Sequence, residues 1–139
     1  MKIFHDSLSF STEGEIDIID LTARVSEKVA ASGVQTGLAH LFVPGATGAL
    51  TAIEYEPGLI EDFTNMLEAL VKNRPGWKHN LSHGDSNAHS HLRASLIGPD
   101  ISIPVRKGKP KLGTWQQIIF VELDTRNRSR EVEITVIGE

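Results

Sequence analysis

Ile118-Ile119-Phe120-Val121-Glu122-Leu123 is an apolar, β-branched run in the C-terminal third of the chain. It lies between two segments, residues 101–105 and 132–136, in which apolar and polar side chains alternate. A β-branched apolar run and an alternation with a period of two both indicate β-strands. We therefore predict three strands here, separated by a turn at Gly108 and by the polar residues 124–130.

Four more strands are predicted nearer the N-terminus. Residues 3–10 and 16–19 are short apolar stretches with a Glu-Gly dipeptide between them, which suggests a hairpin. Residues 34–43 end at a proline, and residues 49–55 are expected to return after a turn that contains two glycines.

Helical spacing of apolar residues predicts three helices. The first covers residues 22–32 and is followed by a glycine suited to a helix C-terminus. The second begins at Pro57, carries an apolar stripe with a period of 3.6 residues, and is stopped by Pro75. The third covers residues 88–97, and residues 77–87 before it are polar and predicted to be a loop.

These elements predict a single α+β domain over residues 1–139. The short links between strands favour a largely antiparallel sheet, with two to three helices packed on one face. The sequence contains no linker, repeat or low-complexity tract that would indicate a second domain.

Composition excludes several classes of function. The chain of 139 residues has no cysteine, so thiolate catalysis and zinc-thiolate sites are excluded. A net charge of −4 disfavours a general nucleic-acid binder. No apolar run is long enough for a membrane span, and no signal peptide is recognised, so we expect a cytoplasmic protein.

Histidines are concentrated in the middle of the chain. Four of the six fall within thirteen residues, where even scattering would place about 0.6. Imidazoles and carboxylates together bind metal ions, and Asp85 lies in the same window. The window therefore predicts a site for Zn²⁺ or a similar ion, held by His79, His89 and either His91 or a carboxylate. The alternative is a solvated loop that happens to be rich in histidine.

The geometry of His89 and His91 depends on the element that carries them. On a strand the two side chains would share a face, whereas on a helix they diverge and His89 pairs with Arg93 one turn later. The helix is favoured because a glycine ends this segment and its two leucines are four residues apart. Asn87 is then expected to be the N-cap of that helix.

Three other segments carry polar groups. Glu54, at the end of a predicted strand, is a candidate general base or metal ligand, or else a plain exposed carboxylate. The turn at 44–48 contains Thr47 and backbone N–H groups that can bind phosphate, although a tight β-turn explains it more simply. Lysines 107, 109 and 111 can attract a phosphorylated ligand, although a solvated hairpin tip is the simpler explanation.

The run Gly113-Thr114-Trp115-Gln116 directly precedes the apolar strand. Trp115 is predicted to be a core anchor with its indole N–H hydrogen-bonded. Thr114 and Gln116 are either structural or point their polar groups at a ligand, and the residues alone leave both possibilities open.

The chain resembles the YjbQ family, whose members are described as secondary thiamine-phosphate synthases. The resemblance rests on Asn87-Ala88-His89-Ser90-His91-Leu92-Arg93-Ala94-Ser95-Leu96-Ile97-Gly98, on Ile103-Pro104-Val105, and on Gly108 with Leu112-Gly113-Thr114-Trp115-Gln116. It implies an α+β fold and a homotrimer with a site shared by adjacent subunits.

The resemblance also implies a set of site residues. The family's recurring polar positions correspond here to Glu54, His79, Asp85, His89, Arg93, Ser95, Thr114 and Gln116. Thr47 and His91 are added from the residues themselves, and many relatives carry a residue other than histidine at position 91. In the combined set the expected catalytic residues are Glu54, Asp85, His89 and Arg93. The substrate is expected to contact Thr47, Ser95, Thr114 and Gln116. A divalent metal, zinc or magnesium, is expected at His79, His89 and His91. One departure is Gly45, because many relatives carry a histidine at that position.

The implied reaction joins a pyrimidine-methyl diphosphate to a thiazole phosphate and releases pyrophosphate, so a small phosphorylated substrate is expected. A cation at the diphosphate would assist departure of the leaving group. Two other hypotheses remain: a metal-dependent hydrolase or lyase acting on another small substrate, and a non-enzymatic trimeric protein that binds a ligand or metal.

Overall fold

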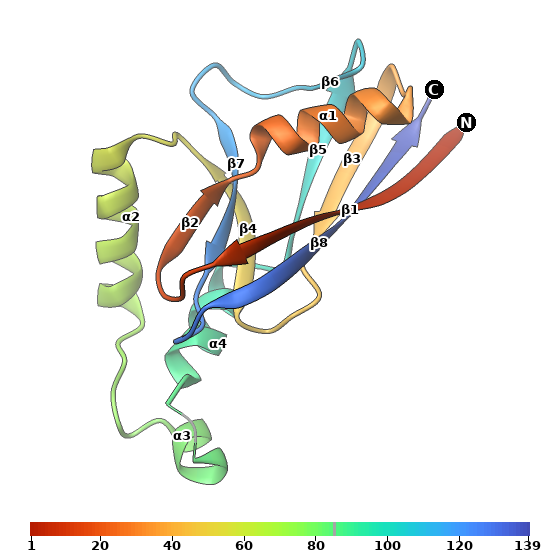
Figure 1. Ribbon diagram of the computed structural model, residues 1–139. Helices are drawn as coiled ribbons and strands as arrows, with labels where there is room; N and C mark the ends of the chain where they lie inside the picture. Colours follow the sequence, from red (N-terminus) through yellow and green to blue (C-terminus); the bar gives the residue numbers. More distant parts are fainter. Residues whose placement is uncertain (85) are drawn as a thin grey trace.

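The computed structural model describes residues 1–84 and 86–139, which form eight strands and four helices (Figure 1). In chain order they are β1 (Lys2–Thr12), β2 (Asp17–Asp20), α1 (Thr22–Ser32), β3 (Thr36–Phe42), β4 (Gly48–Ile53), α2 (Pro57–Leu70), α3 (Lys78–His83), α4 (Ala88–Ile97), β5 (Asp100–Arg106), β6 (Lys109–Pro110), β7 (Gln117–Glu122) and β8 (Arg128–Gly138). Among the described helices, none has both the length and the apolar character needed to cross a lipid bilayer.

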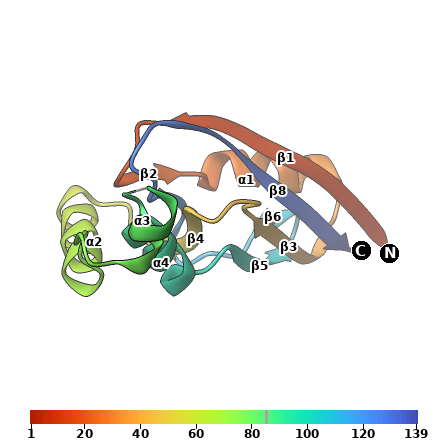
Figure 2. The same cartoon turned by 90° about the horizontal axis from the view of Figure 1, so that it is seen from below.

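The strands form two antiparallel sheets. The larger has the order β1-β8-β3-β5-β6, and the smaller has the order β2-β7-β4. The long strands β1 and β8 pair along their whole length, from Lys2 with Gly138 to Thr12 with Arg128. Figure 2 shows these two strands arching over the rest of the molecule, so the larger sheet is curled. The α+β class and the antiparallel pairing are as predicted.

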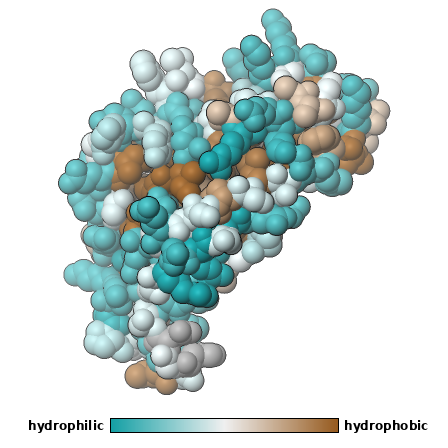
Figure 3. Space-filling view, in the orientation of Figure 1, coloured by the Kyte–Doolittle hydropathy of each residue, from teal (hydrophilic) through white to brown (hydrophobic). Residues whose placement is uncertain are grey.

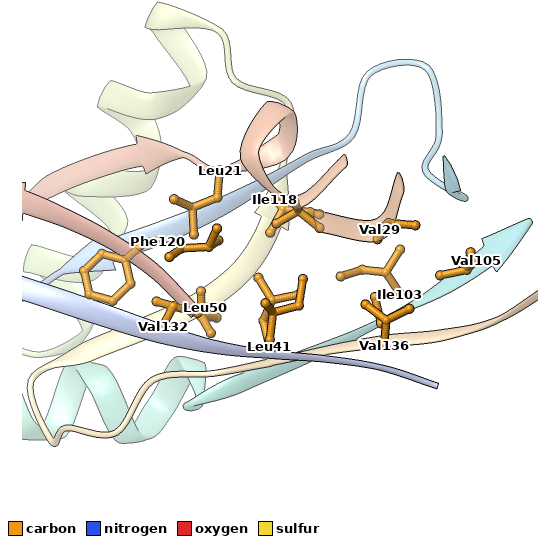
Figure 4. Packing of buried hydrophobic residues seen from close by; sticks show 14 of the residues in the cluster. Leu21, Val29, Leu41, Leu50, Ile103, Val105, Ile118, Phe120, Val132 and Val136 are labelled. Atoms are coloured by element: carbon orange, nitrogen blue, oxygen red, sulfur yellow. The ribbon is translucent and has the colours of Figure 1, made fainter. Parts of the chain in front are cut away.

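The main hydrophobic core lies between the two sheets (Figure 4). The larger sheet contributes Leu41, Ile103 and Val136, and the smaller sheet contributes Leu50, Ile118 and Phe120. Helix α1 closes this core with Val25 and Val29, which are fully buried. Burial of such side chains stabilises the fold by about 1.5–3 kcal/mol each.

A second core lies on the opposite face of the smaller sheet. Leu67 of α2 and Ala94 of α4 pack there against Ile119 and Val121 of β7. On the face shown in Figure 3, apolar surface gathers over the strands beside α2, and the surrounding surface is mostly hydrophilic. Strand β7 is therefore covered on both faces, because successive side chains of a strand point to opposite sides.

Two local predictions about strand pairing are corrected by this arrangement. The hairpin predicted near the N-terminus is wrong, because β1 pairs with β8 while β2 pairs with β7. Strands β3 and β4 likewise belong to different sheets. Turn residues show where the chain reverses but not which strand the following segment pairs with. The turn signals in the sequence therefore could not predict the pairing partners of these strands.

The helices differ from the prediction in number and placement. Helices α1 and α4 have the predicted bounds, while α2 ends at Leu70, before the proline expected to stop it. The six-residue α3 lies in the segment that was predicted to be a loop. The prediction missed this helix because its sequence has no apolar stripe. The helices do not share one face: α1 packs in the main core, and α2 and α4 pack in the second.

Trp115 is not a core anchor, since 72% of its side chain is exposed. The apolar strand that follows fills both cores with its own side chains, so the tryptophan stays on the surface.

Gly37 provides a test of the pairing between β3 and β8. A Cβ at this position would collide with the carbonyl oxygen of Ile137 in the backbone of β8. We expect Gly37→Ala to lower the free energy of unfolding by about 1–3 kcal/mol, measured by urea denaturation.

Gly76→Ala is the matched control, because a Cβ at Gly76 would meet no atom within 4 Å. Unchanged stability of Gly37→Ala would show that the pairing between these strands is not as described.

Candidate functional site

Helices α3 and α4, together with the segment that joins α2 to α3, surround a cavity of about 570 Å³. Figure 1 shows these elements at one end of the molecule. We call this the Trp77 cavity; it is lined by Arg74, Gly76, Trp77, Lys78, His79, Ala88, His91 and Leu92. Among the residues that the structure describes, its lining contains two cationic side chains, two imidazoles and an indole, and no carboxylate.

Trp77 is held in place by two contacts. Its indole Nε1–H donates a hydrogen bond to the carbonyl oxygen of Lys72 at 2.9 Å. The guanidinium of Arg74 stacks over the indole ring, 4.1 Å from its centroid. A guanidinium in this position is attracted to the aromatic face, so the cation and the ring are fixed together.

A second cavity of about 520 Å³ lies on the other side of His91 and Leu92, which line both. We call it the Gly45 cavity, because the turn at 44–48 forms one wall with Gly45, Ala46 and Gly48. Ser95 lines it from α4, and its hydroxyl donates to the carbonyl oxygen of Leu92. The two cavities therefore meet at the N-terminal half of α4.

The rings of His79 and His91 meet edge to face, with centroids 4.8 Å apart. The Nε2 atom of His79 lies 3.2 Å from the Oδ1 atom of Asn87. The side-chain amide of Asn87 also donates to Asp124 at 3.5 Å. A chain of polar contacts thus leads from the paired imidazoles to a buried carboxylate.

Asn87 does not cap α4 through its side chain, contrary to the prediction. The first backbone N–H of the helix, that of Ala88, donates instead to Oδ1 of Asn80 in α3. Helix α3 was not predicted, so its asparagine could not be recognised as the cap. The side chain of Asn87 does not cap the helix and instead hydrogen-bonds to both His79 and Asp124.

Asp124 is buried, and it is hydrogen-bonded to several donors. Burial alone raises the pKa of its carboxyl group, but the Thr125 N–H and the Arg128 and Asn87 side chains outweigh this and lower the pKa below its ordinary value. Arg128 also forms an ion pair with it at 2.5 Å. Asp124 is therefore a carboxylate at neutral pH.

Glu122 and Arg130 form a buried ion pair beside Asp124. Glu122 also accepts hydrogen bonds from Thr12 and from the N–H of Asp124. Arg130 donates to Thr47, whose hydroxyl donates in turn to Asp124 at 3.3 Å. Thr47 therefore anchors the turn at 44–48 from inside and does not belong to the lining of the Gly45 cavity.

His89 and Arg93 form a separate buried cluster. The Nε2 atom of His89 lies 2.7 Å from Glu15, and Arg93 contacts the same carboxylate at 3.5 Å. Arg93 also donates to the carbonyl oxygen of Val71 at 2.9 Å. The structure thus places His89 on a different side of α4 from His91, as expected of helical residues two apart.

The remaining predicted site residues are dispersed in the single chain. Glu54 is exposed after the end of β4. Thr114 and Gln116 line a different cavity, which they share with α1. Asp85 lies outside the described residues. Of the predicted set, His79, His91 and Ser95 come together around the two cavities.

The divalent metal implied by the resemblance was tested against these donors. Among the side chains that the structure describes, which do not include those of His83 and Asp85, no group of three or more histidines or carboxylates is arranged to hold a metal ion. Protein zinc sites use three or four such ligands. The described residues therefore do not fit a resident metal ion.

Sequence reasoning missed several residues of the site. Arg74, Trp77 and Lys78 alternate basic and aromatic character, a pattern typical of sites for planar anionic ligands, and this signal could have been used. Glu15 and Asp124 gave no such signal, because each contacts the site through a residue that is distant in the sequence. Glu15 contacts His89, 74 residues away, and Asp124 contacts Asn87, 37 residues away.

The family model for UPF0047 proteins of the YjbQ-like type matches residues 6–139. The chain belongs to the YjbQ/UPF0047 family. It is 37% identical over 139 residues to a UPF0047 protein of Methanothermobacter thermautotrophicus, covering 100% of this chain and 95% of the relative. A UPF0047 protein of Archaeoglobus fulgidus is 41% identical over 117 residues, with coverage of 84% and 89%.

Solved structures of the YjbQ/UPF0047 family have the same fold. A YbjQ-like protein of unknown function from Sulfolobus solfataricus superposes with a TM-score of 0.94, at 38% identity over 99% of both chains. A hypothetical protein from Aeropyrum pernix gives a TM-score of 0.85 at 40% identity, covering 96% of this chain and 99% of the other. The resemblance seen in the sequence is confirmed, and the names of these relatives state no reaction.

Asp124 provides a test of the polar chain behind the site. Its folded-state pKa is lowered, so its carboxylate stabilises the fold above its ordinary pKa of 3.8, and this stability is lost as the pH falls through the folded-state value. We expect Asp124→Asn to destabilise the protein by about 1–3 kcal/mol at neutral pH. Urea denaturation at several pH values should show this difference shrinking below the ordinary pKa.

Asp62→Asn is the control, because Asp62 is exposed on α2. A stability difference that stays constant down to low pH would contradict an ionised Asp124.

Proposed function

We propose that this YjbQ-family protein is a transferase that joins a pyrimidine-methyl diphosphate to a thiazole phosphate and releases pyrophosphate. The composition of the Trp77 cavity supports this proposal best. It combines an aromatic face at Trp77 with the cations of Arg74 and Lys78, and none of its lining residues that the structure describes is a carboxylate. An aromatic heterocycle that carries a diphosphate has the complementary chemistry.

The reaction needs little from the protein beyond binding and charge stabilisation. The bond between the methylene carbon and the diphosphate oxygen breaks, and its electron pair leaves with pyrophosphate. The thiazole nitrogen donates its lone pair to the methylene carbon and forms the new C–N bond. Cations at the diphosphate stabilise the charge that develops on the leaving group.

Arg74 and Lys78 are the cations placed to bind the diphosphate. His79 and His91 stand beside them and can donate hydrogen bonds to phosphate oxygens. Trp77, held by Arg74 and by the carbonyl oxygen of Lys72, offers a face on which the pyrimidine can stack. The protein thus supplies stacking and positive charge at neighbouring positions.

Two adjoining cavities also suit a reaction between two substrates. The Gly45 cavity shares His91 and Leu92 with the Trp77 cavity, so a molecule bound in each would meet at these residues. In this proposal the thiazole phosphate occupies the Gly45 cavity. Holding two reactants side by side removes much of the entropic cost of their encounter.

The homotrimer belongs to the same proposal. Leu92 lines both cavities and is 39% exposed, and Leu96 on the same helix is 59% exposed. A neighbouring subunit that covers these leucines would also bring further polar residues to the cavities. Such residues could supply the ligands that a zinc or magnesium ion lacks in the single chain, and elemental analysis of the purified protein tests this.

The activity is tested by incubating the purified protein with both precursors and Mg²⁺ and measuring thiamine phosphate and pyrophosphate. We expect Arg74→Ala and Lys78→Ala each to reduce turnover about 10²-fold or more, because a cation at the leaving group is lost. Lys72→Ala is the matched control, since Lys72 is a neighbouring cation whose side chain does not line the cavity.

The outcomes separate the three hypotheses. Pyrophosphate released without the thiazole phosphate would indicate a hydrolase. Binding of both precursors without turnover would indicate a non-enzymatic binding protein. Turnover that is equal in all three variants would remove the Trp77 cavity as the site.

A further inference from the structure

The hairpin formed by β5 and β6 concentrates positive charge in a protein whose net charge is −4. Arg106, Lys107, Lys109 and Lys111 fall within six residues. With Pro110 and Leu112 they line a cavity of about 580 Å³, and none of the described residues in its lining is a carboxylate. We call this the hairpin cavity.

These four cations are not neutralised within the described part of the chain. None of them forms an ion pair there, and Arg106 donates only to the neighbouring carbonyl oxygen of Val105. Some cations elsewhere are paired, since Lys28, Arg128 and Arg130 each contact a carboxylate. Four like charges around one cavity repel one another, and a bound anion would remove that repulsion.

The geometry of the turn does not favour a lysine at position 107. Arg106 pairs with Lys109, so Lys107 and Gly108 form a two-residue hairpin loop with φ values of +53° and +70°. Such turns favour asparagine or glycine at both positions, because other residues are strained at positive φ. Lysine occupies the first position despite this strain, which places one more cation at the rim of the cavity.

A cavity of about 530 Å³ adjoins the hairpin cavity and shares Lys109, Pro110 and Leu112 with it. It lies between α1 and the segment that leads into β7. Its remaining polar lining consists of uncharged hydroxyl and amide side chains, those of Thr22, Ser26, Thr114, Gln116 and Gln117. We call this second cavity the neutral cavity. It is continuous with the hairpin cavity, so the combined surface has a cationic part and an uncharged part.

We propose that this surface is a second ligand site, which takes a small phosphorylated molecule with a neutral polar body. The phosphate lies among the four cations of the hairpin, and the body extends toward α1. The site goes beyond the proposed transferase function, because β6 lies at the opposite end of the molecule from α3 and the Trp77 cavity (Figure 1). A hollowed site on an acidic protein favours a small ligand over a nucleic acid, which needs an extended basic face.

Calorimetric titration with inorganic pyrophosphate tests the anion site. The background is the Arg74→Ala/Lys78→Ala variant, which removes the cations of the Trp77 cavity. We expect this variant to bind pyrophosphate, and the further changes Lys107→Gln, Lys109→Gln and Lys111→Gln to weaken that binding about tenfold or more. Circular dichroism confirms that each variant is folded.

A charge-matched control carries Lys2→Gln, Lys72→Gln and Arg126→Gln in the same background. It removes as many positive charges but leaves the hairpin intact, so its affinity should change much less. Equal losses in both variants, or the absence of pyrophosphate binding to the background protein, would overturn the proposal. Because these measurements need no turnover, their result does not depend on whether the protein is a transferase.

The neutral cavity is tested with a sugar phosphate. We expect ribose 5-phosphate to bind more tightly than inorganic phosphate, and Ser26→Leu, which fills the neutral cavity, to remove this advantage without affecting inorganic phosphate. Equal affinity for the two ligands would contradict a role for the neutral cavity. Binding of a short RNA or of anionic vesicles without binding of either phosphate would show that the site does not take a small ligand.

Discussion

The buried ion pair between Glu122 and Arg130 joins the two sheets, and the candidate site depends on it. Glu122 belongs to β7 of the smaller sheet and Arg130 to β8 of the larger one. An unpaired charge in this position would be strongly destabilising, so the carboxylate needs all of its hydrogen bonds. Arg130, Thr12 and the N–H of Asp124 provide them, and the two sheets are held at a fixed distance as a result.

The same corner of the molecule positions both cavities. Arg130 holds Thr47 and with it the turn that forms one wall of the Gly45 cavity. Gly48 follows directly, and a Cβ there would approach the ring of Phe120 to 2.6 Å, so the turn can pack closely against β7 only with glycine. Asp124 reaches in the opposite direction, through Asn87 to His79 in the Trp77 cavity. One buried polar network therefore contacts both the turn beside the Gly45 cavity and His79 of the Trp77 cavity.

Sequence periodicity was sufficient for the elements that bury a regular face. Helices α1 and α4 follow from spacing and from the glycines that end them, and the apolar parts of the C-terminal strands follow from their alternation. Strand β8 is longer than predicted, because it begins at Arg128, within the polar segment expected to separate the strands. Strand partners were not predictable, because the partner of β1 lies more than 110 residues away in β8. Histidine clustering indicated the segment in which the rings of His79 and His91 meet, and its role as a site stays a prediction. The pairing of His89 with Glu15 depends on a long-range contact that no local pattern records. The YjbQ resemblance added the family and the fold, and its implied site residues are spread over several cavities of the single chain.

Cationic side chains gather around one cavity at each end of the molecule, the Trp77 cavity and the hairpin cavity. Carboxylates outnumber cations in the chain, eighteen to fourteen, yet the described residues that line the Trp77 cavity and the hairpin cavity include cations and no carboxylate. A surrounding negative field also lowers the concentration of anions near the surface, so an anionic ligand is bound only where cations are locally concentrated. The acidic background and the two cationic cavities together favour small anions bound at defined positions over diffuse binding of polyanions.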